Sequence, residues 1–363
     1  MVKVLQILPS LNCCGGVENY IMNYYRKIDK TKIQFDFLYH LESPVNFIEE
    51  IKKMGGNVFK QPKFSIRNFN IIVDNFCEIL KANKYDAIHC HQANAAFLYL
   101  KIAEKQNVKL RILHSHQSKA SDTIMHSIRN IPLLYIGKKY SNFNIACSNL
   151  AGKYLFNKAN FTVINNAVEV SMFKYNEELR KEIREKFNIC ASDYVIGHVG
   201  RFCNQKNQLF LLKVFKSISN ENPRVKLMLI GDGELKSKIT RYIEKNNLIE
   251  KVILTGSVND VYKYYNSMDL LVMPSIYEGL PVVGVEAQYN GLNMIVSDNI
   301  TNELNFSKNI IYLNLRDVEK WEETIIFFIN NGKRNIVVSS EYDINEQVKC
   351  LENLYIKLSE NEN

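Results

Sequence analysis

Two carboxylates stand eight residues apart in the run Tyr277–Ala287, which reads YEGLPVVGVEA. Glu278 follows a short apolar stretch that is typical of a buried parallel strand, and Pro281 stands where a helix would begin. Glu286 is then expected inside that helix, roughly 12 Å along its axis from Glu278. The run therefore predicts a strand, a tight loop and a helix, with one acidic residue in the loop and one in the helix.

The position of these two carboxylates indicates the kind of ligand they would bind. In open α/β sheets ligands bind at the carboxyl ends of the strands, where a helix N-terminus attracts an anion. Two carboxylates would repel a bare phosphate, but each accepts hydrogen bonds from hydroxyl groups well. A nucleotide sugar, with a diphosphate between a ribose and a hexose, satisfies both conditions. The alternative is a solvated helix face with a capping glutamate.

Two cations lie in another predicted strand-to-helix loop, after the strand Tyr194–Val199. Arg201 offers a planar fork of donors and Lys206 a compact ammonium, so together they suit a diphosphate. Two solvated loop cations are the alternative. A Gly-Asp-Gly turn, residues 231–233, follows the next predicted strand and would bring two stretches of backbone close together.

A glycine pair, Gly15 and Gly16, separates the first predicted strand, Val2–Leu8, from a helical pattern over Asn19–Ile28. Glycines let the backbone approach a phosphate closely, although they also serve ordinary turns. The dinucleotide fingerprint G-x-G-x-x-G is absent here, which disfavours a nicotinamide dehydrogenase.

Four histidines form two pairs with i, i+2 spacing at the ends of two predicted strands: His89, His91, His114 and His116. This spacing places both rings of a pair on one face of a strand. Imidazoles gathered in this way are able to bind a metal ion. However, neither pair contains a carboxylate, and histidines at strand ends often bond loop carbonyls. We therefore expect no metal site.

The alternation of short apolar runs with helical patterns predicts the α/β class, with parallel sheets covered by helices on both faces. A polar stretch within residues 166–192 is expected to separate two halves. A helix over Ile344–Ser359 carries an apolar stripe. The predicted helix Ile124–Tyr140 combines apolar, aromatic and basic residues, which indicates a core helix, a membrane-surface helix or a wall of an acceptor cleft.

Composition excludes several classes of protein. The 363 residues are enough for two domains, and no apolar run approaches the ~20 residues of a membrane-spanning helix. The N-terminal run is too short for a signal peptide. The eight scattered cysteines contain no C-x2-C pair, so we expect neither a zinc site nor a disulfide framework. We expect instead a reduced, cytoplasmic location.

The net charge of +8 is unevenly distributed. Residues 1–175 carry 23 basic and 12 acidic side chains, a balance of +11, and the remainder carries −3. A basic first half suggests an anionic partner, such as lipid headgroups or a diphosphate-linked acceptor. No nucleic-acid motif accompanies this charge, so nucleic acid is not expected. A lysine-rich surface that reflects an AT-rich genome is the alternative.

The run with Glu278 and Glu286 resembles the E-x7-E signature of retaining glycosyltransferases of family 4. This family has the GT-B fold, an α/β architecture of two Rossmann-like domains with a cleft between them. The resemblance implies that Glu278 acts at the donor sugar and that Glu286 holds the ribose hydroxyls. It also implies that the loop after Glu278 binds the donor: Gly279, Leu280 and Pro281.

Other positions extend the resemblance. Arg201 and Lys206 match the family's "GR…K", which stabilises the leaving diphosphate, and the Gly15-Gly16 pair matches a loop that faces the donor diphosphate and the acceptor. His116 matches a catalytic-site histidine near the donor sugar. The histidine pair at 89 and 91 matches an "H-x-H" strand end with a structural or acceptor-side role. The turn at residues 165–169 resembles the family's "NGVD" turn but departs from it at Ala167 and Glu169.

The resemblance implies a domain organisation and an activity. Residues 1–170 would form an acceptor-side domain onto which helix 344–359 packs back, and residues 190–340 a donor-binding domain. The expected activity is metal-independent retaining transfer of a hexosyl unit, without a cofactor, from a nucleotide sugar. By family habit this donor is a UDP-sugar, and the acceptor is a polyprenyl-diphosphate-linked glycan in capsular, exopolysaccharide or O-antigen synthesis.

This reaction would take place in the cytoplasm, peripherally at the inner face of the cell membrane, on the anionic surface that the basic N-terminal domain would contact. Two alternatives belong to other functional classes. One is a sugar-nucleotide epimerase of the same fold, which needs no acceptor. The other is a non-catalytic partner of a sister transferase.

Overall fold

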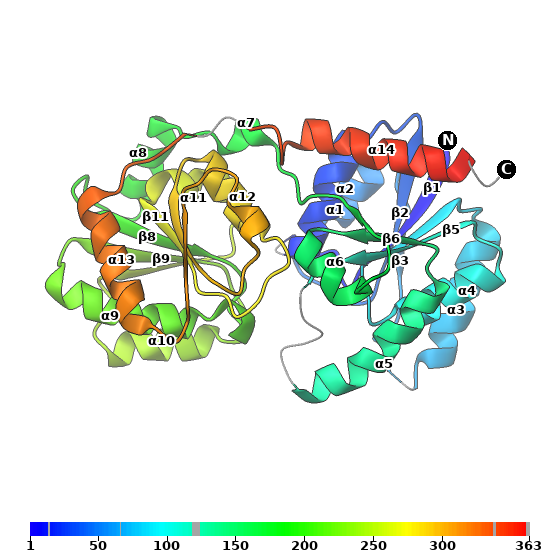
Figure 1. Cartoon of the computed structure of the whole chain (residues 1–363), viewed down its shortest axis with the longest axis horizontal. Helices are drawn as coiled ribbons and strands as arrows, with labels where there is room; N and C mark the ends of the chain where they lie inside the picture. The colour runs from blue at the N-terminus through cyan, green and yellow to red at the C-terminus, as the bar shows by residue number, and fades with distance from the viewer. Residues whose placement is uncertain (14, 66, 118–123, 337–338, 361–363) are drawn as a thin grey trace. The chain divides into compact units, whose positions relative to one another are not determined.

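The structure, a computed structural model, describes residues 1–13, 15–65, 67–117, 124–336 and 339–360 (Figure 1). Cys14, which directly precedes the glycine pair, and Ser118, two residues after His116, lie outside these ranges. The chain forms two compact units. Unit 1 comprises Met1–Ala167 and Glu341–Asn363, and unit 2 comprises Val168–Ser340.

The sheet of unit 1 is entirely parallel and has the strand order β3-β2-β1-β4-β5-β6-β7. The order reverses direction between β1 and β4, which makes this pair the switch point where α/β sheets bind ligands. The seven strands are β1 Val2–Ile7, β2 Ile33–Tyr39, β3 Val58–Lys60, β4 Ala87–Cys90, β5 Leu110–Ser115, β6 Phe143–Ala146 and β7 Thr162–Val163.

Helices cover both faces of this sheet, and successive residues of β1 enter opposite cores. Val4 packs into the core beneath α1 and α14, and Leu5 into the core beneath α3 and α4, so the strand is apolar on both faces. In Figure 1 the red helix α14 lies beside the blue helix α1. The helices of unit 1 are α1 Gly16–Lys27, α2 Ile48–Lys53, α3 Phe69–Ala82, α4 Ala96–Lys105, α5 Ile124–Tyr140, α6 Asn149–Phe156 and α14 Ile344–Glu360.

Unit 2 repeats this plan with six parallel strands in the order β10-β9-β8-β11-β12-β13, and its switch point lies between β8 and β11. Trp321 is fully buried in its core. The strands are β8 Tyr194–Val199, β9 Val225–Ile230, β10 Val252–Gly256, β11 Leu270–Met273, β12 Asn293–Ser297 and β13 Ile310–Leu313. The helices are α7 Val170–Phe173, α8 Glu177–Lys186, α9 Gln208–Glu221, α10 Lys236–Lys245, α11 Val261–Ser267, α12 Val282–Tyr289 and α13 Val318–Asn331, with 3-10 turns at Asn204–Lys206 and Asn302–Leu304.

The parallel α/β class predicted from the sequence is confirmed, and some helix boundaries differ. Helix α1 begins at Gly16 rather than at Asn19, because Gly15 takes the extended N-cap conformation and the glycine pair itself opens the helix. Helix α8 begins at Glu177, within the polar stretch of residues 166–192, because the Asn176 side chain accepts hydrogen bonds from the second and third helical N–H groups.

Candidate functional site

In unit 2 the loops after β8 and β11 meet because the two strands are neighbours in the sheet. The backbone N–H of Ile276 donates to the Gln205 carbonyl at 2.8 Å, and Gln205 Nε2 donates to the Tyr277 carbonyl at 3.0 Å. These bonds tie the loop that carries Lys206 to the loop that carries Glu278. Two predicted site residues that are 72 positions apart in the sequence therefore share one sheet edge.

Lys206 and Glu278 form a direct ion pair, with 2.6 Å between Nζ and Oε1. Their side chains are only 16% and 9% exposed, so solvent screens the pair weakly. Gln205 Nε2 lies 3.5 Å from the second carboxylate oxygen. The resemblance implied that Lys206 binds the diphosphate and Glu278 the sugar of one donor. The structure instead joins them to each other, because an unpaired buried charge would be destabilising.

The loop Gly279-Leu280-Pro281 is buried and leads into α12. Pro281 occupies the N-cap position, with φ −72° and ψ 118°, so the helix proper starts one residue later. The first N–H groups of a helix lack intrahelical acceptors and carry a partial positive charge. The N-terminus of α12 therefore favours an anion close to Glu278.

Arg201 is exposed in the loop after β8, and the Gly-Asp-Gly turn holds that loop in place. The Phe202 N–H donates to the Asp232 carbonyl at 2.9 Å. Gly231 has φ +139°, and a Cβ there would lie 2.1 Å from the Gly200 carbonyl oxygen. Only glycine permits this approach of two backbones, so the turn fixes the backbone on both sides of Arg201.

Glu286 lies on α12, where it accepts a hydrogen bond from Tyr265 Oη of α11 at 2.6 Å. Burial raises the pKa of Glu286 to about 7, although the Tyr265 hydroxyl lowers it in part. About half of this carboxyl group is thus ionised at neutral pH. Sequence reasoning missed Tyr265, because no spacing rule relates a residue of α11 to one of α12; it also missed Gln205, although that residue adjoins Lys206.

In unit 1 the two predicted glycines have different surroundings. A Cβ on Gly15 would lie 2.0 Å from a carboxylate oxygen of Glu18, a buried residue that accepts a hydrogen bond from the Ser10 hydroxyl. A Cβ on Gly16 would meet nothing within 4 Å among the described atoms. Gly15 therefore serves local packing, whereas Gly16 leaves the N-terminus of α1 open.

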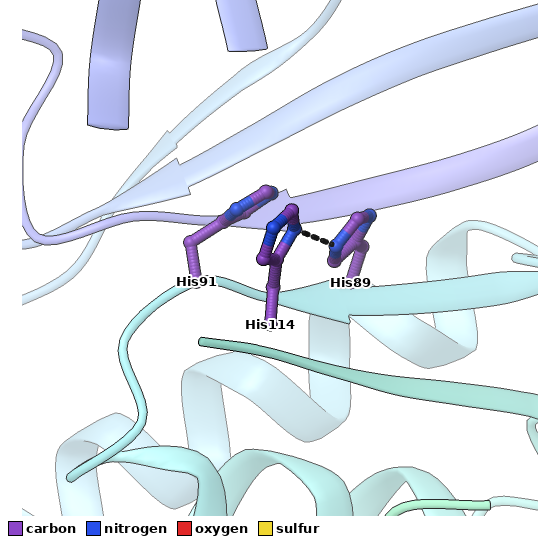
Figure 2. A group of neighbouring side chains, drawn as sticks. All are labelled: His89, His91 and His114. Carbon is purple, nitrogen blue, oxygen red and sulfur yellow. Dashed lines mark hydrogen bonds between the residues drawn. The ribbon is translucent and has the colours of Figure 1, made fainter. Parts of the chain in front are cut away.

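The four histidines lie together at the carboxyl ends of β4 and β5, and Figure 2 shows three of them, His89, His91 and His114. His89 Nε2 and His114 Nδ1 are 3.0 Å apart, and His91 Nδ1 and His116 Nε2 are 2.8 Å apart. His89 stacks on His91 with ring centroids 4.2 Å apart, and His114 on His116 at 3.9 Å. We call this array of two hydrogen-bonded pairs the histidine cluster.

The expectation that these histidines bond loop carbonyls is wrong. The i, i+2 spacing on two adjacent parallel strands turns all four rings to one face of the sheet, where they bond one another and nearby side chains. Burial lowers the pKa of His116 to about 3 and lowers the pKa values of His89, His91 and His114 well below their usual range. The cluster is therefore neutral at physiological pH.

Ring nitrogens of His89, His91 and His114 lie within 4.8 Å of one another, a separation that a metal ion can bridge. The ring planes are only moderately inclined, however, at 12° between His89 and His114, 21° between His89 and His91 and 33° between His91 and His114. Imidazole binds a metal through a lone pair in the ring plane, and rings inclined so little do not direct three lone pairs to one point. Hydrogen bonding between the rings accounts for this arrangement without a metal ion.

Comparison with known proteins supports the inferences from the fold. A family model for group 1 glycosyl transferases matches residues 179–340. The chain is 32% identical to the putative glycosyltransferase EpsF of Bacillus subtilis over 97% of this chain and 96% of that protein. It is 27% identical to the capsular polysaccharide biosynthesis glycosyltransferase CapH of Staphylococcus aureus, over 98% and 99% of the two chains.

Two further proteins are similar over most of the chain. One is the UDP-Gal:alpha-D-GlcNAc-diphosphoundecaprenol alpha-1,3-galactosyltransferase of Escherichia coli, 26% identical over 80% of this chain and 82% of that protein. The other is Anabaena Alr3699/HepE, whose crystal structure in complex with UDP-glucose superposes with a TM-score of 0.76 at 15% identity, covering 99% of this chain and 98% of that chain.

The two parallel sheets and this structural neighbour define a GT-B protein, and the related sequences define an enzyme that transfers glycosyl groups. Within that class, the chain belongs to the group 1 glycosyl transferases. This agrees with the resemblance of its E-x7-E run to glycosyltransferase family 4.

Proposed function

We propose that the protein is a retaining hexosyltransferase that uses a UDP-sugar and a polyprenyl-diphosphate-linked glycan in capsular, exopolysaccharide or O-antigen synthesis. The observation that carries this proposal is the Lys206–Glu278 pair at the switch point of unit 2, next to the N-terminus of α12. The structure of HepE with UDP-glucose supports the donor class, and the diphosphoundecaprenol substrate of the E. coli relative supports the acceptor class.

The donor diphosphate would lie at the N-terminus of α12, where Lys206 exchanges its bond to Glu278 for one to phosphate. Arg201, on the same loop as Lys206, adds a second cation. These charges stabilise the leaving diphosphate, so the reaction needs no metal ion. Glu278, released from Lys206, then accepts hydrogen bonds from hydroxyls of the donor sugar, and the loop Gly279-Leu280-Pro281 surrounds that sugar.

Glu286 would accept hydrogen bonds from the two ribose hydroxyls at the other end of the donor. The Tyr265 hydroxyl bonds Oε2 of Glu286 and holds the carboxyl group in one orientation. Ribose hydroxyls donate hydrogen bonds, so they favour the ionised form of Glu286 over the protonated form. This role links donor binding to the ionisation of one residue.

Unit 1 would supply the acceptor side, with Gly16 at the open N-terminus of α1 and His116 as a neutral partner for a sugar hydroxyl. The domain ranges 1–170 and 190–340, with helix 344–359 added to the first, are part of this proposal. In the family, the loop that matches Gly15 and Gly16 faces both the donor diphosphate and the attacking hydroxyl.

We propose a peripheral location at the cytoplasmic face of the membrane for the same enzyme. On α5, Tyr135 is 74% exposed and Ile131 58% exposed, and Lys138 lies over the Tyr135 ring. Apolar side chains beside basic ones suit an anionic lipid surface. In the part of the chain that the structure describes, no helix has the length and apolar character to cross a bilayer.

A two-stage experiment tests this proposal. Nucleotide sugars are first screened by thermal shift, because a ligand that binds the native state raises its melting temperature. The stabilising donor is then incubated with and without a polyprenyl-diphosphate-linked glycan, and the products are analysed for anomeric configuration. Acceptor-dependent transfer with retention supports the proposal. An epimerised donor formed without acceptor supports the epimerase instead, and absence of any turnover supports a non-catalytic partner.

A further inference from the structure

The histidine cluster is connected to a buried amide in the middle of the sheet of unit 1. Gln6 of β1 is fully buried, and its Oε1 lies 2.8 Å from His91 Nε2. Its Nε2 donates to the hydroxyl of Tyr355, on α14, at 3.2 Å. That hydroxyl lies 2.6 Å from His89 Nδ1. Two hydrogen-bonded arms therefore start at Gln6.

The first arm fixes the proton of each ring in turn. An amide oxygen only accepts hydrogen bonds, so His91 carries its proton on Nε2 and its Nδ1 is a bare acceptor. His116 Nε2 must then donate to His91 Nδ1, at 2.8 Å. Both rings are neutral and carry one proton each, so Nδ1 of His116 retains a free lone pair. Within the described ranges, no protein group bonds that nitrogen.

The second arm runs the other way. Gln6 donates to the Tyr355 oxygen, so the Tyr355 hydroxyl donates to His89 Nδ1. His89 Nε2 then donates to His114 Nδ1 at 3.0 Å. This leaves the proton of His114 on Nε2, a buried atom that has no hydrogen-bond partner among the described residues. The two arms share only Gln6, so a change in one arm need not alter the other.

We propose that Gln6 is a positioning residue that fixes His116 in the Nε2–H tautomer, with Nδ1 presented as a hydrogen-bond acceptor to a hydroxyl of the substrate. This inference rests on the proposed function of His116 and extends it to the chemistry that this ring recognises. A bare ring nitrogen accepts a bond from a hydroxyl but offers no proton to a carboxylate or phosphate oxygen. The group that meets His116 is therefore a hydrogen-bond donor, as a sugar hydroxyl is.

The test is a measurement of the tautomer in the full-length protein labelled with 15N-histidine. Two-bond 15N–1H correlations distinguish which ring nitrogen carries the proton, and the spectrum of His116→Ala assigns the signals. In the wild type we expect the His116 proton on Nε2. In Gln6→Met, which keeps a similar volume but removes the amide, we expect His116 to shift toward the Nδ1–H tautomer.

Tyr355→Phe is the matched control, because it removes a hydroxyl from the second arm only. It should change the His89 signals and leave the tautomer of His116 as in the wild type. With the donor found by thermal shift, we expect kcat/KM to fall roughly tenfold in Gln6→Met, the equivalent of one hydrogen bond, and less than about twofold in Tyr355→Phe.

A wild-type His116 protonated on Nδ1 would overturn the inference, and this result needs no variant to fold. An unchanged His116 tautomer in folded Gln6→Met would overturn it as well. If the tautomer shifts while turnover stays constant, the positioning role is wrong although the hydrogen-bonded arm exists. A wild-type protein that shows the expected tautomer but transfers no sugar would count against the proposed function instead.

Discussion

Units 1 and 2 share one architecture but place opposite kinds of chemistry at their switch points. Unit 1 gathers neutral imidazoles that hydrogen-bond one another, and unit 2 gathers a lysine, a glutamate and a carboxyl group whose pKa is raised to about 7. Neutral rings hold protons at fixed atoms, which suits recognition of hydroxyls. A buried ion pair exchanges partners only with another charge, which suits an anionic ligand such as a diphosphate.

The largest effect should come from the ion pair. Glu278→Gln should lower the transfer rate by roughly 10²- to 10³-fold, because an amide replaces the charge that, in the proposed function, would contact the reacting sugar. The measurement is the initial rate with saturating donor, and Glu234→Gln, in an exposed loop of the same unit, is the control. A Glu278→Gln rate within about twofold of the wild type would remove the charged site of unit 2 from the chemistry.

The next effect concerns stability and should be confined to unit 1. Leu351 of α14 is fully buried in the core with Tyr24 and Phe35, so Leu351→Ala should destabilise unit 1 by about 3 kcal/mol. Urea unfolding followed by hydrogen exchange of each unit measures this change. Lys349→Ala, on the exposed face of the same helix, should change little. An equal loss of stability in unit 2 would show that the two units unfold as one.

Donor affinity should depend on pH through Glu286. Its folded pKa of about 7 lies above the value of about 4.5 expected when unfolded, and the native state favours the protonated form between these values. Ribose favours the ionised form, so affinity should rise about tenfold from pH 6 to pH 8, as calorimetry with a UDP-sugar would measure. The same ionisation should lower stability as pH rises from about 4.5 through 7.

Glu286→Gln supplies the control for this pH dependence. The amide does not titrate, so the donor should bind with nearly constant affinity from pH 6 to pH 8. A UDP-sugar is the better probe than UDP, whose terminal phosphate titrates near pH 6 itself. A wild-type affinity that falls with rising pH would contradict the assignment of Glu286 to the ribose hydroxyls.

The smallest effect expected is none at all. Incubation with EDTA should leave transfer unchanged, because in the proposed function Arg201, Lys206 and the N-terminus of α12 would stabilise the diphosphate without a metal ion. Initial rates before and after chelation, with and without added Zn²⁺ or Mg²⁺, test this expectation. Activity lost on chelation and restored by Zn²⁺ would instead point to the histidine cluster as a metal site.

Local patterns in the sequence predicted much of unit 2. Strand, tight turn and helix N-terminus occur within a dozen residues around Glu278, so spacing and residue type suffice to place that carboxylate in a loop and Glu286 in a helix. The pairing of Lys206 with Glu278 did not follow from the sequence. It depends on β8 and β11 being neighbours, which is a property of the strand order and not of either motif.

In unit 1 even fewer of the contacts could be predicted from local sequence. The i, i+2 spacing predicted that each histidine pair shares a face, but it did not show that the two pairs meet. Gln6 and Tyr355 are separated by 349 residues, and no local signal distinguishes either of them from other buried polar residues. Networks assembled from distant strands and a returning helix become visible only in three dimensions.

Helix α14 has a consequence for how the protein forms during synthesis. Its residues leave the ribosome only after all of unit 2, yet Leu351 and Tyr355 complete the core of unit 1 and one arm of its histidine cluster. Unit 1 must therefore wait for the synthesis of α14 to reach its native packing, while unit 2 holds every strand of its own sheet before α14 emerges. A nascent chain stalled before residue 344 would carry a folded unit 2 and an incomplete unit 1.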